Sequence, residues 1–317
     1  MGKEQKNEIG RVISGIKKGD RQSISRAITI AESAPEMFAS LIKPLYNPKK
    51  EARVIGIVGP PGCGKSSLIA MIAPKLTAMG NKLGVIAIDA SSPFTGGSFL
   101  GNRIRMQDSL SNNKIFMRSM ASRGAKGGLA AAVMNAILVL SSAGYDYIIV
   151  EPVGSGQADV DILDIASTIV LVLAPGLGDE IQAAKAGLME IGNIFVINKV
   201  DLPGADKAER DIRYFISTGP AEKRQQNIVK TSTVSREGID ELAQAIIEHE
   251  KSVDKNEFIK YRFYMETLRI ATEIFSEHID HLKKERPKWL ETSLSEATDP
   301  YSAAEKIIKR IESDEKL

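Results

Sequence analysis

The sequence predicts an α/β protein with a mostly parallel sheet and helical extensions at both ends. In the middle of the chain, short apolar segments alternate with segments of helical periodicity, which is the pattern of strands joined by crossover helices. A glycine-rich loop separates the first apolar segment from the first of these helices. At both ends the periodicity is helical only. The expected parts are an N-terminal helical extension over residues 1–50, an α/β domain over 51–252 and a C-terminal helical dimerisation region over 253–317.

The composition of the 317-residue chain excludes several classes of protein. Its 42 basic and 40 acidic residues leave a net charge of +2, so no general attraction to nucleic acid or to a membrane surface is expected. The N-terminus is charged and no apolar stretch approaches the length of about 18 residues that a membrane span needs, so neither a signal peptide nor a span is predicted. The single cysteine, Cys63, allows no internal disulfide, which fits a reducing, cytoplasmic setting.

Two helices are expected before the sheet. Asp20 opens a segment whose apolar residues share one helical face, and Pro35 opens another. Residues 47–53 form a short polar linker into the first strand.

The α/β domain is expected to contain six strands, each short and apolar enough to be covered on both faces. The second strand is followed by a long loop, 90–107, whose many Gly, Ser and Thr residues indicate a functional segment. The strands are expected at 54–58, 83–88, 147–150, 168–173, 194–197 and 228–231, and the helices at 65–79, 126–143, 179–191, about 205–216 and 238–250.

After residue 255 the apolar residues recur at helical spacing up to a break before Pro287. A helix of this length has a longer apolar stripe than a small domain covers, so we expect a partner subunit there. The alternative is a helix folded back over the sheet. Asp299 as N-cap and Pro300 as first helical residue open a last helix.

The glycine-rich loop is a P-loop, G-x-x-x-x-G-K-S, running from Gly59 to Ser66. Its glycines let backbone N–H groups turn inward, and the helix starting near Lys65 directs its positive N-terminal end to the same point. Lys65 would contact the β- and γ-phosphates of a nucleotide and Ser66 would bind Mg²⁺. The predicted fold is therefore that of the P-loop NTPases. The nucleotide-binding residues expected here are Pro61, Gly62, Cys63, Gly64, Lys65, Ser66 and Ser67.

Two acidic residues follow strands of the predicted sheet. Asp89 follows the second strand and Glu151 the third, so both are expected to face the phosphates at the carboxyl edge. A carboxylate at such a position holds Mg²⁺ directly or through water in many P-loop proteins. For each residue the alternative is a solvated strand end or a helix cap.

A guanine-binding motif, Asn198-Lys199-Val200-Asp201, follows the strand at 194–197. An aspartate accepts hydrogen bonds from the N1–H and the 2-amino group of guanine, whereas adenine offers neither donor. GTP is therefore expected in preference to ATP. The segment after the last strand suits a loop that supports the base, through Ser232, Thr233 and Val234.

These motifs resemble the methylmalonyl-CoA mutase-associated GTPases. The resemblance rests on G-P-P-G-C-G-K-S-S, T-G-G-S-x-L-G, E-P-V-G-S-G-Q, A-P-G-L-G-D-E-I-Q and N-K-V-D, and it extends from about residue 10 to 250. It implies a homodimeric, Mg²⁺-dependent GTPase that chaperones a cobalamin-dependent acyl-CoA mutase, gating cofactor loading and protection without itself holding cobalamin. By motif position it implies catalytic roles for Lys65, Glu151, Gln157 and Lys185, the last two as switch elements.

Two positions depart from the family pattern. The family usually has E-T-V-G where this chain has Pro152, and an aspartate where this chain has Asn102. The metal ligands expected by this correspondence are Ser66, Asp89, Asn102 and Glu151.

Three other functions share parts of this pattern. A nickel-delivery GTPase would need clustered Cys and His. The chain has one Cys, in the P-loop, and its three His residues all lie in the C-terminal part. A P-loop kinase would transfer phosphate to a second substrate, and N-K-V-D argues against it. A GTP-binding module with negligible turnover remains open at this point.

Overall fold

The structure is a computed structural model that describes residues 2–78, 80–89, 113–121, 128–152, 161–176, 188–218, 227–285 and 299–314. Its contacts divide the chain into two compact units, Met1–Arg262 and Phe263–Leu317. The first unit holds the sheet, the N-terminal helices and the start of a long C-terminal helix.

The first unit is built on a seven-stranded sheet in which all the described neighbours are parallel. The strand order is β3-β2-β4-β1-β5-β6-β7. The predicted α/β class with a P-loop NTPase sheet is thus confirmed, and the carboxyl ends of the central strands lie along one edge. The strands are β1 (Arg53–Val58), β2 (Leu83–Asp89), β3 (Ile115–Ala121), β4 (Tyr147–Glu151), β5 (Thr168–Leu173), β6 (Ile194–Ile197) and β7 (Asn227–Lys230).

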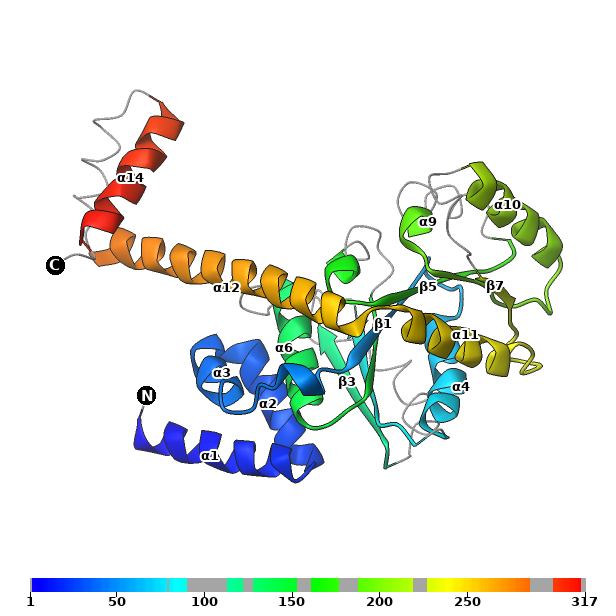
Figure 1. Cartoon of the computed structure of the whole chain (residues 1–317), viewed down its shortest axis with the longest axis horizontal. Coiled ribbons are helices and arrows are strands. Elements are labelled where there is room, and N and C mark those ends of the chain that lie inside the picture. The colour runs from blue at the N-terminus through cyan, green and yellow to red at the C-terminus, as the bar shows by residue number, and fades with distance from the viewer. Residues whose placement is uncertain are drawn as a thin grey trace, which may run out of the picture. The chain divides into compact units, whose positions relative to one another are not determined.

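Helices cover both faces of this sheet (Figure 1). Alternate residues of β1 supply the two cores: Ile55 and Ile57 pack with the helices α4 (Lys65–Ala78) and α11 (Ile239–Ser252). Val54 and Val58 belong to the other core, formed with α6 (Gly128–Ser142) and the N-terminal helices. Burial of both faces explains why the strand segments are apolar throughout.

The N-terminal extension consists of α1 (Lys3–Lys17), α2 (Arg21–Ser33) and α3 (Pro35–Ile42). Asp20 caps α2, because its carboxylate accepts a hydrogen bond of 2.9 Å from the Ser23 backbone N–H. The α2 helix packs against α6, so the extension completes the core on that face. A 3₁₀ turn, η1 (Pro48–Lys50), leads into β1, and another, η2 (Asp161–Asp164), precedes β5.

The prediction for the segment between β2 and α6 was wrong in one respect. It was expected to contain no strand, but Ile115–Ala121 forms the edge strand β3, parallel to β2. Arg118 interrupts its apolar run, and its guanidinium pairs with Glu32 of α2 at 2.5 Å. The partner that stabilises this polar residue is far away in the sequence, so the local pattern did not show a strand.

The remaining helices of the first unit are α9 (Leu188–Ile191) and α10 (Ala205–Thr218). The predicted helix at 179–191 lies partly outside the described residues, since 177–187 are not among them. The chain then continues into α12 (Lys255–Glu285), which confirms the long C-terminal helix.

The second unit contains the later part of α12 and α14 (Pro300–Asp314). Asp299 caps α14 as predicted, because its Oδ1 accepts hydrogen bonds from the backbone N–H groups of Tyr301 and Ser302 at 2.9 and 3.0 Å. Large apolar side chains of α12 are exposed, among them Phe263, Tyr264, Leu268, Ile274 and Phe275. In the part of the chain that the structure describes, no helix combines the length and apolarity that a membrane crossing requires.

Candidate functional site

The P-loop joins the end of β1 to the start of α4 at the carboxyl edge of the sheet. Gly59, Gly62 and Gly64 have φ values of 144°, 75° and 96°, in the region that favours glycine. A Cβ on Gly59 would also overlap the backbone carbonyl of Val172, and one on Gly64 would overlap the Asn198 side chain. The glycines therefore fix both the loop's conformation and its close approach to the neighbouring strands.

Lys65 lies under this loop and is 7% exposed. Its Nζ donates hydrogen bonds to the carbonyl oxygens of Gly59 at 2.7 Å and Pro60 at 3.2 Å. Both partners are neutral, and phosphate oxygens that enter the loop would be stronger acceptors for the same ammonium. Lys65 is therefore held at the P-loop, and its contact with nucleotide phosphates stays a prediction.

Ser66 and Glu151 meet at the next point along the edge. The Ser66 hydroxyl donates a hydrogen bond of 2.6 Å to Oε1 of Glu151, the last residue of β4, which is 7% exposed. A hydroxyl and a carboxylate in contact form an all-oxygen site of the kind that Mg²⁺ prefers. Asp89 ends β2, the strand beside β4, so its backbone reaches the same edge. Asn102, Gln157 and Lys185 lie outside the described residues.

Asn198 fastens the P-loop to the loop after β7. Its side chain is fully buried, donates from Nδ2 to the carbonyl oxygen of Cys63 at 2.9 Å, and accepts from the Thr231 hydroxyl at 3.1 Å. This bridging role of Asn198 and Thr231 was not expected from the sequence. A buried amide directly after an apolar strand is the signal that could have indicated it, because such a group needs protein partners.

Lys199 and Asp201 lie on the outer side of the same motif. Lys199 has φ 59° and its Nζ donates to the carbonyl oxygen of Gly62 at 2.6 Å, so its side chain crosses the P-loop. Asp201 is exposed, and its Oδ1 accepts a hydrogen bond of 2.5 Å from the Ser232 hydroxyl. Within the described residues its other oxygen, Oδ2, accepts none. The carboxylate is thus oriented and still able to accept from a guanine base.

The loop after β7 holds Ser232 in place. The Ser232 side chain is fully buried and accepts from the Ser235 backbone N–H at 3.2 Å, while its own N–H donates to the carbonyl oxygen of Glu237. Thr233 is half-buried and Val234 is exposed. Of the three residues predicted to support the base, Ser232 contacts Asp201 directly, and Thr233 and Val234 follow it in the same loop.

Cys63 and His249 are buried or half-buried and contact other parts of the protein. Cys63 is buried in the P-loop, and burial raises the pKa of its thiol, which makes it unreactive. His249 contacts the Thr168 hydroxyl through Nδ1 at 2.8 Å, and burial lowers its pKa. Within the described ranges, no group of three or more His, Cys, Asp or Glu side chains is placed to hold a metal ion.

A parallel sheet, a P-loop with its buried lysine, and an aspartate oriented after a strand together define a P-loop GTPase. The family described as "Methylmalonyl Co-A mutase-associated GTPase MeaB" matches residues 24–288, and the chain belongs to this family. The resemblance to this family is confirmed, and the protein is a GTPase.

Two relatives and one solved structure illustrate the match. A protein of Pyrococcus horikoshii named as a GTPase is 39% identical over 316 residues, covering 96% of this chain and 98% of that one. "Methylmalonic aciduria type A homolog, mitochondrial" of Caenorhabditis elegans is 30% identical over 260 residues, covering 76% of this chain and 65% of that protein. The crystal structure of an LAO/AO transport system kinase matches with a TM-score of 0.66 and 22% identity over 98% of this chain and 99% of that one, which supports the fold alone.

Proposed function

We propose that this GTPase is a chaperone of a cobalamin-dependent acyl-CoA mutase of the methylmalonyl-CoA type, gating loading of the cofactor and its protection. The observation that carries the proposal is the family match over residues 24–288, whose description names such a mutase. The name of the Caenorhabditis elegans relative points the same way. In this proposal the mutase holds cobalamin and the present chain holds GTP or GDP. Its single cysteine fits a cytoplasmic setting.

The oxygen atoms of Ser66 and Glu151, 2.6 Å apart at the carboxyl edge, fit a Mg²⁺ ion bound with the nucleotide. We propose that Asp89 and Asn102 complete this metal site. Bound there, Mg²⁺ would neutralise charge on the phosphates. Lys65 would exchange its two carbonyl partners for phosphate oxygens and stabilise the charge that develops during hydrolysis. Gln157 and Lys185 are proposed as the switch residues that sense which nucleotide is bound.

Asn102 gives a prediction about metal affinity, because the family resemblance implies an aspartate at this position. An amide keeps one carbonyl oxygen as a ligand but removes a negative charge from the site. Asn102→Asp is therefore expected to lower the Mg²⁺ concentration for half-maximal GTPase activity on the order of tenfold. The measurement is a Mg²⁺ titration of phosphate release for both proteins. Identical titrations would place residue 102 outside the metal site.

The exposed apolar residues of α12 support a proposed homodimer, because a helix with this face in water would be stabilised by a second copy. We expect deletion of residues 263–317 to convert a dimer into a monomer while leaving GDP affinity unchanged, since the nucleotide site lies entirely in the first unit. Light scattering and GDP titration check the two parts. A full-length protein that is already monomeric would remove the homodimer from the proposal.

Affinity purification from native cells tests the partner. A tagged wild-type chain in the presence of a non-hydrolysable GTP analogue is expected to retain a cobalamin-dependent acyl-CoA mutase. The matched bait is Asp201→Asn, which should lose nucleotide-dependent retention because it no longer holds the guanine base. Retention of a nickel enzyme, or of no mutase in a cell that contains one, would contradict the proposal.

A further inference from the structure

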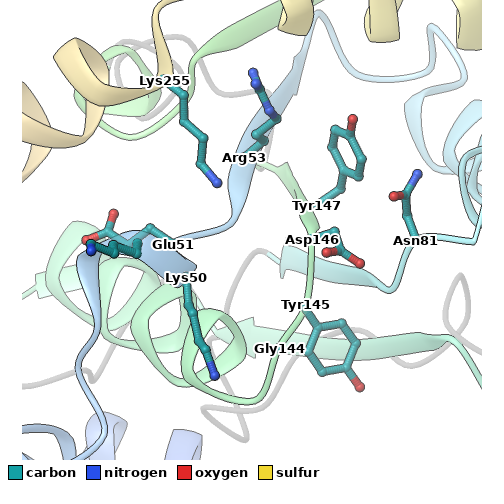
Figure 2. Close-up of a pocket in the computed structure, with 10 residues that line it drawn as sticks. Lys50, Glu51, Arg53, Asn81, Gly144, Tyr145, Asp146, Tyr147 and Lys255 are labelled. Atoms are coloured by element: carbon teal, nitrogen blue, oxygen red, sulfur yellow. The ribbon is translucent and has the colours of Figure 1, made fainter.

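The first unit contains a pocket at the edge of the sheet opposite the P-loop (Figure 2). It lies where β1 and β4 begin, and β1 separates it from the P-loop by about 17 Å, at roughly 3.3 Å per residue. Its volume is about 500 Å³, within the usual range for small-molecule sites. It is lined by Lys49, Lys50, Glu51, Arg53, Asn81, Gly144, Tyr145, Asp146, Tyr147 and Lys255.

The lining contains four basic and two acidic side chains, and both acidic ones already have partners. Glu51 is 4% exposed; it pairs with the buried Arg262 and accepts a hydrogen bond of 2.8 Å from the Tyr46 hydroxyl. Asp146 accepts from the Lys82 backbone N–H at 2.8 Å. The charge of Glu51 is therefore offset by a guanidinium outside the pocket lining, whereas Asp146, among the described residues, contacts only a neutral backbone amide and keeps its negative charge.

Lys255 is a basic lining residue with no ion-pair partner among the residues that the structure describes. It is the first residue of α12 and is half-buried, and its ammonium makes no hydrogen bond or ion pair with any residue that the structure describes. Figure 2 shows its side chain entering the pocket on the side where Glu51 lies, with Asn81 and Tyr147 on the other side. Burial, and then the charge of Arg53, lower the pKa of Lys255 from its usual value, whereas the carboxylate of Glu51 opposes this shift, and an anion in the pocket would oppose it further.

Arg53 contributes a second, firmly held cation. Its Nη1 donates to Oε2 of Glu250 at 2.9 Å and also to the Glu250 backbone carbonyl. Glu250 is 1% exposed and accepts further hydrogen bonds from the hydroxyls of Ser167 and Thr168, at 2.7 and 2.5 Å. The guanidinium is thus fixed at the pocket wall by groups behind it. Lys49 and Lys50 are both exposed and add two positive charges, on long side chains, at the rim of the pocket.

We propose that this pocket binds a phosphomonoester of a small organic molecule, with the phosphate at Lys255, Arg53 and the rim lysines and the organic part against Tyr147 and Asn81. The charge of Arg53 is offset by Glu250, so the three lysines of the lining face the single carboxylate of Asp146, which has no ion-pair partner within the described ranges. The remaining positive charge exceeds what one carboxylate ligand would neutralise, which favours a phosphate dianion. The volume exceeds what an inorganic phosphate fills, and the Tyr147 ring offers a planar surface for an organic group. The site is distinct from the GTP site and goes beyond the proposed chaperone function.

Calorimetry on the full-length chain, with GDP and Mg²⁺ filling the P-loop site first, tests the proposal. The probes are AMP, ribose 5-phosphate, inorganic phosphate and adenosine. AMP or ribose 5-phosphate is expected to bind one per chain with a Kd below about 1 mM, and more tightly than inorganic phosphate. Adenosine, which lacks the phosphate, should not bind. Absence of binding by both phosphomonoesters, or equal binding of AMP and adenosine, would overturn the assignment of a phosphate site. Equal binding of AMP and inorganic phosphate would overturn the proposed contact of an organic group with Tyr147 and Asn81.

A matched pair of variants locates the binding. Lys255→Gln is expected to weaken binding of the phosphomonoester on the order of tenfold, whereas Lys260→Gln, with the same charge change at an exposed position of α12 outside the pocket lining, should leave it unchanged. GDP affinity should be the same in both. If Lys255→Gln fails to fold, Lys50→Gln at the rim is expected to give a severalfold loss. Equal weakening by the pocket variant and Lys260→Gln would show a general charge effect and overturn the site.

Discussion

Replacing Lys65 by alanine is expected to reduce GTP hydrolysis on the order of a thousandfold. The ammonium is buried beneath the P-loop, held by two backbone carbonyls, and directed where phosphate oxygens would lie. Its removal takes away the cation that would stabilise the charge developing on these oxygens. The measurement is single-turnover release of phosphate at saturating GTP.

The control for Lys65→Ala is Lys75→Ala, on the same helix but paired at the surface with Asp240. A surface pair contributes at most about 1 kcal/mol, so this variant should hydrolyse GTP normally. Both variants should show wild-type circular dichroism. Unchanged turnover in Lys65→Ala would mean that the P-loop is not where GTP is hydrolysed.

Replacing Asp201 by asparagine is expected to weaken GDP binding on the order of a thousandfold and to allow xanthosine diphosphate to bind instead. The carboxylate accepts from Ser232 through Oδ1 and is otherwise available to the N1–H and 2-amino group of guanine. An asparagine can still accept from Ser232 but directs N–H donors at those guanine donors. Xanthine has a carbonyl oxygen in place of the 2-amino group and would accept from them.

The control for Asp201→Asn is Asp206→Asn, because Lys230, the partner of Asp206, also pairs with Glu209 at 2.6 Å and so keeps a partner. Calorimetric titrations with GDP and xanthosine diphosphate should show wild-type preference for this variant and reversed preference for Asp201→Asn. Equal GDP affinity in Asp201→Asn and the wild type would remove the guanine-binding role from this residue.

The nucleotide site could be predicted from sequence because its parts are local. Gly59 to Ser66 are consecutive residues between a strand and a helix, and Asn198 to Asp201 follow a single apolar strand. The sequence around each motif therefore shows where in the sheet the motif lies. Apart from β3, the order of the strands was predictable for the same reason, since strands buried on both faces have an apolar pattern that needs no partner to be recognised.

The features that sequence did not predict depend on distant partners. The edge strand β3 contains Arg118, whose charge is stabilised by Glu32 on α2. The pocket opposite the P-loop is lined from η1, β1, β4 and α12, and its charge balance depends on the pairing of Glu51 with Arg262, 211 positions apart. In a single sequence, nothing near one residue of such a pair indicates which distant residue is its partner.

Steady-state formation of GDP and phosphate, with and without a methylmalonyl-CoA-type mutase encoded in the same genome, tests the proposed GTPase chaperone most directly. The chain alone is expected to hydrolyse GTP in preference to ATP and to transfer no phosphate to another acceptor. Addition of the mutase should change GTP turnover at least severalfold, because a client that binds one nucleotide state better must shift the balance between states. Lys65→Ala should remain inactive under both conditions. Equal GTP turnover with and without the mutase, or a labelled product other than GDP and phosphate, would contradict the proposal.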